Sequence, residues 1–159
     1  THRVRAILVA RTQLVGMCTA LINKIRGLAR TFGMTVGAGK GGSFDRAVRR
    51  VLPGDPMISD LFEALLETLA TLRERRRQFD NQLKRIALDS QTCRLLMTVP
   101  GIGPLTAIAF AGTIEDPARF RRSSDVGAYL GLTPRRYQSG EIDHGGRISK
   151  CGDKMPRKH

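Results

Sequence analysis

The sequence contains no tryptophan, and only 5% of its residues are aromatic. A hydrophobic core must therefore consist mostly of leucine, isoleucine, valine and alanine, which fits the 41% of residues that are hydrophobic. The 159 residues are enough for one domain or two small ones. A compact chain of this length buries about 70% of the surface that its unfolded form exposes, so a core of useful size is possible.

Cysteine and histidine are also scarce, with three residues of each. The cysteines, at positions 18, 93 and 151, include no close pair, which excludes a C-x-x-C zinc or redox motif and a disulfide framework. The histidines form no cluster of ligands, so we predict no metal site in these residues. A reducing cytoplasm is the expected compartment.

Long apolar runs are absent as well. Gly, Pro or Arg interrupts the apolar stretches before they reach the length of a membrane span, so we predict no membrane contact. No signal peptide precedes the first helical pattern. Because the chain has no initiator methionine and begins within that pattern, we interpret it as a fragment of a longer protein.

Acidic residues are few, since 14 Asp and Glu face 27 Lys and Arg, which gives a net charge of +13. The excess is concentrated at the two ends of the chain, with +9 over residues 1–52, −1 over 53–93 and +5 over 94–159. Such an imbalance predicts a polyanionic partner, and the contacts are expected at the two ends. The alternative is that these charges only solvate the exposed faces of helices.

The first half of the chain has the pattern of long helices. Residues 3–32 contain no proline and carry an apolar stripe in steps of four and three, which predicts an amphipathic helix of about 45 Å. Gly33 is the expected end of that helix. A Gly-rich loop is predicted over 33–43, followed by a short helix over 43–52.

A second long helix is predicted to begin at Asp55 and Pro56, because Asp55 can cap the first turn and Pro56 suits it. Its apolar residues also alternate in steps of four and three, which is the heptad pattern of a coiled coil, with one arginine interrupting. The predicted seam consists of Ile58, Phe62, Leu65, Leu69, Leu72, Arg76, Phe79, Leu83 and Ile86.

Two long helices joined by a loop predict an antiparallel helical hairpin, or coiled coil, over residues 1–89. This hairpin could also join copies of the chain into a homo-oligomer. A plain helical bundle inside one compact domain is the alternative. Residues 90–159 are richer in glycine and proline and are expected to form a separate, truncated C-terminal domain. The predicted fold class is mainly α.

Within the C-terminal domain we expect short helices over residues 91–98 and 104–114. A third helix is expected to be capped by Ser123 or Ser124, followed by an extended segment and a short β-hairpin around Ser139-Gly140. The third helix is predicted to turn Val126, Tyr129 and Leu130 inward.

The turn Pro100-Gly101-Ile102-Gly103-Pro104, together with Leu95, Leu96, Val99 and Ala107 around it, resembles the helix-hairpin-helix element of nucleic-acid-binding proteins. Gly101 can adopt a positive φ for the tight turn. Gly103 has no Cβ, so a phosphate could approach the backbone and the amides that open the next helix. A plain turn between two packed helices is the alternative reading.

The stretch 129–140, Tyr-Leu-Gly-Leu-Thr-Pro-Arg-Arg-Tyr-Gln-Ser-Gly, continues into Gly146-Arg147-Ile148-Ser149-Lys150. Together with the glycine-rich turn, this motif resembles the C-terminal domain of bacterial insertion-sequence transposases of the DEDD type, which include the Piv invertases. Residues 3–32 are similar to the same family. The resemblance therefore covers nearly the whole chain.

The resemblance implies a recombinase with two catalytic parts joined by a coiled coil. The first is a RuvC-like domain whose four carboxylates bind a divalent metal such as Mg²⁺, and it is expected to be missing from these residues. The second is the C-terminal domain, in which Ser139 matches the position of the family's catalytic serine. This chain departs from the family around that serine, with Gln138 before it and Glu141-Ile142-Asp143 after Gly140.

A serine that attacks a phosphodiester needs a base, alignment and positive charge near the phosphoryl oxygens. Arg135, Arg136, Arg147 and Lys150 could supply the charge and are predicted nucleic-acid contacts, together with Gly101 and Gly103. No base is obvious, because His144 and Asp143 lie too close to Ser139 in sequence for a triad built from separate elements. Without the resemblance, Ser139 is an ordinary turn serine.

Two functions are consistent with the sequence. The first is part of a DNA transposase or site-specific recombinase in the bacterial cytoplasm, with DNA as the expected partner and a structured RNA as a further candidate partner. The isolated fragment is then expected to be inactive, because it lacks the metal-binding carboxylates. The second is a non-catalytic module that binds nucleic acid and forms oligomers.

Overall fold

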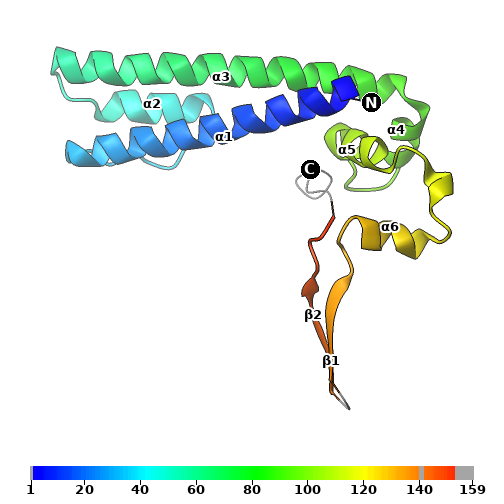
Figure 1. Ribbon diagram of the computed structural model, residues 1–159. Helices are drawn as coiled ribbons and strands as arrows, with labels where there is room; N and C mark the ends of the chain where they lie inside the picture. Colours follow the sequence, from blue (N-terminus) through cyan, green and yellow to red (C-terminus); the bar gives the residue numbers. More distant parts are fainter. Residues whose placement is uncertain (1, 140–141, 153–159) are drawn as a thin grey trace. The chain divides into compact units, whose positions relative to one another are not determined.

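The computed structural model describes residues 2–139 and 142–152, and it is mainly helical with one small two-stranded antiparallel sheet (Figure 1). This confirms the predicted fold class. Along the chain the elements are α1 (His2–Thr31), α2 (Gly42–Val51), α3 (Pro56–Asp89), α4 (Gln91–Leu96), α5 (Pro104–Ile114), the 3-10 helix η1 (Pro117–Arg119), α6 (Ser123–Tyr129), β1 (Pro134–Ser139) and β2 (Ile142–Ile148).

The chain divides into two compact units. Residues 9–81 form the hairpin unit, which contains most of α1 and α3 and all of α2. Residues 82–159 and the first eight residues form the C-terminal unit, of which 2–8, 82–139 and 142–152 are described here. Position 90, where the sequence analysis sets a domain boundary, lies within the C-terminal unit.

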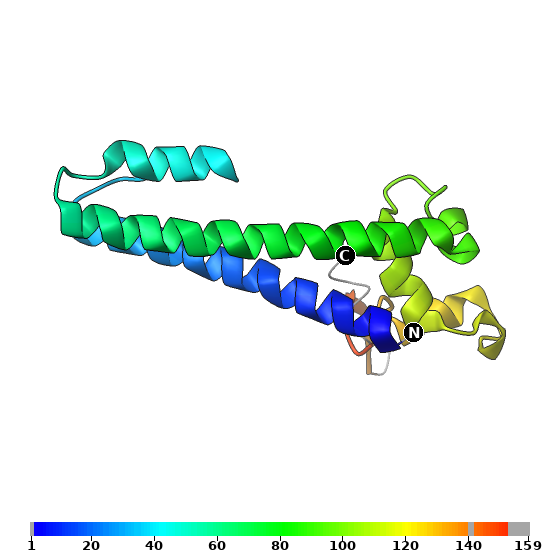
Figure 2. The ribbon, with the colours of Figure 1, turned by 90° about the horizontal axis from the view of Figure 1, so that it is seen from above.

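In the hairpin unit, α1 and α3 run antiparallel side by side, and α2 packs along them (Figures 1 and 2). The loop before α2 begins at Gly33, whose φ of 73° ends α1 as predicted. Phe44 and Val48 of α2 are fully buried and belong to one core with α1 and α3. That core also contains Cys18, Ile25, Ala29, Phe62, Leu66 and Leu69.

The start of α3 is capped as expected. One Asp55 carboxylate oxygen accepts hydrogen bonds from the backbone amides of Met57 at 2.9 Å and Ile58 at 3.4 Å. These bonds satisfy amides that have no partner within the helix. The core is less well covered at the end of α1, where Phe32 keeps 46% of its surface exposed. The Phe32 ring packs edge-on against Phe62, with 6.4 Å between the ring centroids.

The predicted seam of α3 is confirmed at Phe62, Leu69 and Leu83, which are buried, and Leu72 packs partly buried against the same core. The middle of the helix also carries the polar residues Arg73, Arg76 and Asp80, of which only Arg76 was predicted in the seam. Arg73 donates two hydrogen bonds to Asp45 of α2, at 2.7 and 2.8 Å. We define Arg11, Asp45, Arg73, Arg76 and Asp80 as the polar layer of the hairpin unit. Within it, Arg11 donates to Asp80 at 2.8 Å.

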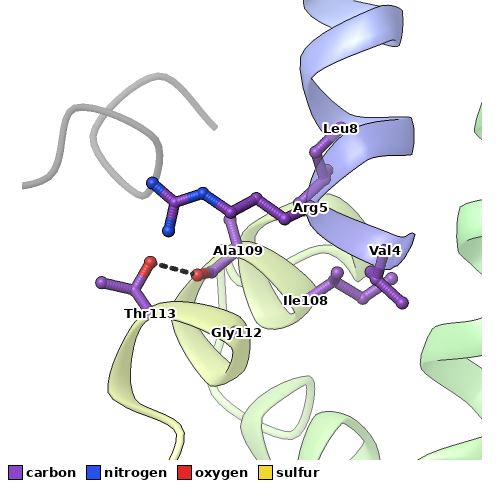
Figure 3. A pocket seen from close by; sticks show the side chains of 7 residues that line it. All are labelled: Val4, Arg5, Leu8, Ile108, Ala109, Gly112 and Thr113. Carbon is purple, nitrogen blue, oxygen red and sulfur yellow. Dashed lines mark hydrogen bonds between the residues drawn. The ribbon is translucent and has the colours of Figure 1, made fainter. Parts of the chain in front are cut away.

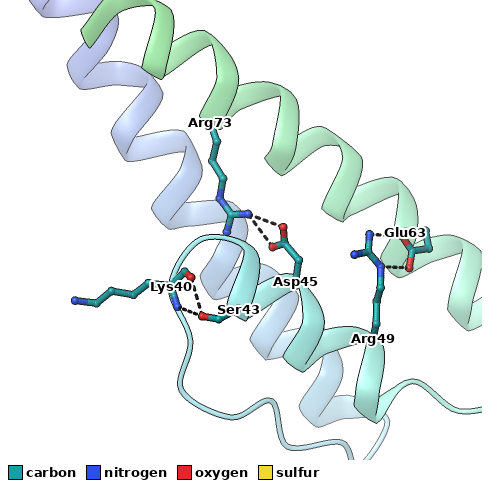
Figure 4. A network of polar contacts seen from close by, with 6 residues as sticks. All are labelled: Lys40, Ser43, Asp45, Arg49, Glu63 and Arg73. Atoms are coloured by element: carbon teal, nitrogen blue, oxygen red, sulfur yellow. Dashed lines mark hydrogen bonds and ion pairs between the residues drawn. The ribbon is translucent and has the colours of Figure 1, made fainter. Parts of the chain in front are cut away.

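A second ion pair joins α2 to α3 near the surface. Arg49 donates to both carboxylate oxygens of Glu63, at 2.8 and 2.9 Å (Figure 4). The hydrogen bond from Arg49 lowers the pKa of Glu63, and the same bond raises the pKa of Arg49. Because both side chains are exposed, this ion pair contributes little to stability, and its main effect is to orient α2 against α3.

The helix α1 is more apolar than the sequence analysis indicates. Contrary to the prediction, it is long and apolar enough to cross a membrane by length and composition alone. In the hairpin unit its residues Cys18, Ile25 and Ala29 are buried in a protein core. This buried stripe is the amphipathic pattern of a helix that packs against other helices.

The C-terminal unit has its own core, which Cys93 of α4 and the buried face of α5 share with the end of α3 and the start of α1. The helix α4 ends at Leu96, two residues before the predicted end. The α6 start also differs from the prediction, since the Asp125 carboxylate accepts from the Arg122 amide at 3.1 Å and neither Ser123 nor Ser124 is the cap.

The end of α6 corrects another expectation. Leu130 is buried as predicted, but Tyr129 is 43% exposed. Its ring packs edge-on against Phe120 at 5.4 Å. The Arg119 guanidinium lies over both rings, 4.9 Å from the Phe120 centroid and 4.6 Å from the Tyr129 centroid. This stack fixes the segment between η1 and α6 without burying it.

Candidate nucleic-acid interface

The β-hairpin carries a basic hollow on one of its faces. Strand β1 pairs antiparallel with β2, with Tyr137 opposite His144 and Ser139 opposite Ile142. Residues of β1, of β2 and of the segment after β2 together line a hollow of about 380 Å³. The lining consists of Arg135, Tyr137, Arg147, Ile148, Ser149 and Lys150, and we call it the hairpin hollow.

Backbone hydrogen bonds hold the segment after β2 against the segment before β1. The Ser149 amide donates to the Thr133 carbonyl at 2.8 Å, and the Lys150 amide donates to the Gly131 carbonyl at 3.0 Å. Lys150 has a positive φ of 57°, a conformation that most residues avoid. The Arg135 guanidinium also donates to the Ser149 carbonyl at 3.3 Å, which holds this cation over the hollow.

Two glycines allow these close approaches. A Cβ on Gly152 would lie 2.1 Å from the Tyr129 carbonyl oxygen, so only glycine fits there. A Cβ on Gly146 would lie 2.9 Å from Cε2 of the Tyr137 ring and 3.1 Å from the Arg135 carbonyl oxygen. The ring of Tyr137 therefore packs against β2 at Gly146, and Tyr137 lines the hollow.

We expect Gly146→Ala to displace the Tyr137 ring and to destabilise the hairpin by about 1–3 kcal/mol, as overpacking does. Hydrogen exchange of the β1 and β2 amides and the ring resonances of Tyr137 would measure both effects. Gly145→Ala is the matched control, because a Cβ at Gly145 meets no atom within 4 Å. Equal effects of the two substitutions would contradict the assigned packing.

The predicted contact residues do not all lie together. Arg135, Arg147 and Lys150 line the hairpin hollow, whereas Arg136 and Ser139 do not. Ser139 is exposed and ends β1. Gly140 and Glu141 lie outside the described residues, and so do the side chains of Gln138 and Asp143.

The glycine-rich turn between α4 and α5 has part of the predicted geometry. Gly101 adopts a φ of 89°, as a tight turn requires. Gly103 precedes Pro104, the first residue of α5, and a Cβ on Gly103 would meet no atom within 4 Å. Nothing therefore obstructs the backbone at Gly103, which leaves the approach to the start of α5 open there.

The described residues do not fit a divalent metal. Among residues 2–139 and 142–152, no three His, Cys, Asp or Glu side chains form a group able to hold an ion. A smaller hollow in the C-terminal unit, between α5 and the start of α1, measures only about 10 Å³ (Figure 3). Its one polar contact in Figure 3 is the hydrogen bond from the Thr113 hydroxyl to the Ala109 carbonyl at 2.8 Å. Such a space holds no ligand larger than a single water molecule.

Two features of the site have no clear signal in the sequence. The stack of Arg119 on Phe120 and Tyr129 joins positions that are separated by a 3-10 helix and a turn. The hairpin hollow depends on backbone bonds between residues far apart in the sequence, such as that from Ser149 to Thr133. The periodicity of a sequence reports neither kind of contact.

The C-terminal segment is similar to a family of known proteins. Residues 93–159 match the model of the family described as Transposase IS116/IS110/IS902 family. This segment contains α5, the glycine-rich turn and the whole β-hairpin. This segment is therefore similar to the transposases that the family description names.

Individual relatives extend the similarity over nearly the whole chain. The chain is 32% identical to a transposase for insertion sequence element IS1111A from Coxiella burnetii, over 97% of this chain and 43% of that protein. It is 32% identical to a probable family 20 transposase from Pseudomonas aeruginosa, over 96% of this chain and 45% of that protein. It is 35% identical to a transposase for insertion sequence element IS1328 from Yersinia enterocolitica, over 65% of this chain and 31% of that protein. The chain thus spans less than half the length of these relatives.

Proposed function

We propose that this chain is part of an insertion-sequence transposase of the DEDD, Piv-like type, which binds DNA and supplies Ser139 as the nucleophile for strand exchange. The observation that carries the proposal is the match of residues 93–159 to the transposase family. The resemblance at residues 129–140 then points to Ser139 within the matched segment. An exposed serine at the end of β1 is consistent with attack on a large substrate.

In the proposed step, the Ser139 hydroxyl oxygen attacks a DNA phosphorus and forms a covalent phosphoserine ester. The bond between phosphorus and one strand's ester oxygen breaks, and that oxygen leaves with a proton as a free hydroxyl end. The proton of Ser139 passes to a base, and reversal on the second strand completes the exchange without a net change in bonds. Arg135, Arg147 and Lys150, which line the hairpin hollow, would hold DNA phosphates near this reaction.

The remaining parts of the proposal rest on the family resemblance. A RuvC-like domain outside these residues would supply the carboxylates for a divalent metal such as Mg²⁺, since the described residues form no such group. The open turn at Gly101 and Gly103 would bind backbone phosphate at the start of α5. The protein would act in the bacterial cytoplasm as a homo-oligomer, with a structured RNA as a further candidate partner.

DNA binding is expected to depend on the cations at the hairpin. Replacing Arg135, Arg136, Arg147 and Lys150 by alanine should lower the slope of log K against log salt concentration by roughly three to four units. The measurement is a salt titration of duplex DNA binding. The matched control removes four exposed cations elsewhere, namely Arg46, Arg50, Lys84 and Arg85. If both variants reduce the slope equally, the hairpin is not the contact surface.

The alternative function is a non-catalytic module that binds nucleic acid and forms oligomers. One observation favours it, because Ser139 is not among the residues that line the hairpin hollow. In that case the cations bind DNA while the serine takes no part in chemistry. Loss of strand exchange without loss of DNA binding in a Ser139 variant separates the two functions.

A further inference from the structure

A second basic hollow lies in the hairpin unit and is larger than the hairpin hollow. It measures about 600 Å³ and is bounded by one face of α1, by the loop before α2 and by the middle of α3. None of its lining residues is acidic. The lining consists of Val15, Cys18, Thr19, Ile22, Asn23, Arg26, Ala38, Gly39, Lys40, Gly41, Arg73 and Arg76, and we call it the loop hollow.

The cations of the loop hollow are only partly neutralised. Arg73 bonds Asp45 through one terminal nitrogen, while its other terminal nitrogen has no hydrogen-bond acceptor among the described residues (Figure 4). The Nε of Arg76 also lacks an acceptor there, since it lies 3.8 Å from Asp80. Asp80 already accepts a hydrogen bond from Arg11 at 2.8 Å. The two carboxylates of Asp45 and Asp80 therefore pair with three arginines, and a net positive charge remains.

The other two cations lie on different sides of the loop hollow. Arg26 of α1 is held by its guanidinium over the Phe44 ring, 5.2 Å from the centroid. Lys40 comes from the loop, and Figure 4 shows its ammonium group extending away from the pair of Asp45 and Arg73. Within the described residues, neither Arg26 nor Lys40 forms an ion pair with a carboxylate. Both therefore add positive charge to the hollow that no carboxylate of the described residues offsets.

The loop is fixed in place rather than merely rich in glycine. A Cβ on Gly39 would lie 2.9 Å from the Phe44 backbone, so only glycine allows the loop to touch the start of α2. The Lys40 amide donates to the Ser43 hydroxyl at 3.0 Å, and that hydroxyl donates to the Lys40 carbonyl at 2.7 Å (Figure 4). The wall of the hollow is thus preorganised, which reduces the entropy lost on binding.

We propose that the loop hollow binds a phosphodiester group of a nucleic-acid strand. Guanidinium groups match phosphate oxygens in geometry and charge, and the Arg26 and Lys40 side chains that line the hollow have no carboxylate partner among the described residues. The apolar floor of Val15, Cys18 and Ile22 suits the face of an adjacent base. The site goes beyond the proposed transposase chemistry, because it lies in the other unit and uses neither Ser139 nor the hairpin cations.

The test is a titration of the ¹⁵N-labelled 159-residue chain with short single-stranded DNA, with single-stranded RNA and with pyrophosphate. Binding in the hollow should shift the amide resonances of Gly39 and Gly41. The double variant Arg26→Gln and Arg76→Gln should lower affinity for the strand roughly tenfold and reduce the salt slope by about 1.5. Lys40→Gln should also weaken binding of the strand. Because Lys40 is exposed, this substitution is not expected to disturb folding.

The matched control is Arg46→Gln with Arg50→Gln, which removes the same charge from exposed positions of α2 outside the hollow. Equal weakening in the control would show a net-charge effect and overturn the proposal. Binding of pyrophosphate without either strand would also overturn it, in favour of a small anion. Shifts confined to residues 131–150 would assign all strand binding to the hairpin. A stronger effect of DNA or of RNA would identify the source of the phosphodiester.

Discussion

Under the proposed function, Ser139→Ala in the full-length protein is expected to abolish strand exchange, with a loss on the order of 10³-fold or more. Alanine has no group that can form the covalent ester with DNA. The affinity for DNA should stay within about twofold, because the fold that presents the cations is preserved. Substitutions at exposed positions usually change the free energy of unfolding by less than about 0.5 kcal/mol. A recombination assay on plasmid substrates and a binding titration of the same protein measure the two quantities.

The first control for Ser139 comes from the same unit. Ser124→Ala removes an exposed serine hydroxyl outside the hairpin hollow and should leave strand exchange nearly unchanged. Ser139→Cys is expected to retain only a trace, since a thiolate attacks phosphorus but forms a different ester. A trapped reaction should yield DNA linked to a peptide through Ser139. Normal exchange by Ser139→Ala, or a link through Tyr137, would refute the assignment.

Phe62→Ala is expected to cost the hairpin unit about 3–5 kcal/mol of unfolding free energy. Phe62 is fully buried in the core shared by α1, α2 and α3, where its ring packs edge-on against Phe32 at 6.4 Å. The substitution would leave a cavity at the contact between the helices. Urea unfolding followed by circular dichroism at 222 nm would measure the loss.

Leu61→Ala is the matched control, because Leu61 precedes Phe62 on α3 and is 43% exposed. It should cost less than about 1 kcal/mol, since a half-exposed side chain loses little burial. Similar losses for the two variants would mean that α3 packs through a different face. The comparison therefore tests the packing of the hairpin unit and does not depend on any function.

The parts of the fold that sequence reasoning predicted are those governed by local rules. The steps of four and three gave both long helices, Asp55 gave the start of α3, and Gly33 gave the end of α1. Each depends on residues within one or two helical turns. The short β-hairpin was also predicted, from the turn-forming pair Ser139-Gly140.

The errors arise where distant residues decide the outcome. The heptad pattern could not show that Arg73 and Asp80 form ion pairs beside the α3 seam, because their partners lie on α2 and α1. Likewise, Tyr129 was expected inside, but stacking with Phe120 and Arg119 stabilises it at the surface.

The candidate site was predicted only in part, for the same reason. The resemblance points to Ser139 and the cations of the hairpin, and three of those cations line one hollow. The loop hollow was not predicted, because Arg26, Lys40 and Arg76 come from three segments. Their convergence depends on how the loop folds back at Gly39, where only the absence of a Cβ permits the contact with Phe44.

The polar layer of the hairpin unit sets the alignment of α1 along α3. Apolar seams tolerate sliding by a whole heptad, since one leucine replaces another at each contact. Here a slide of seven residues would move Arg11 from Asp80 to Arg73 in one direction and to Ala87 in the other. Neither can accept its hydrogen bond. Only one longitudinal alignment of the two helices therefore satisfies Arg11, and the same constraint discourages exchange of α1 between copies in a shifted alignment.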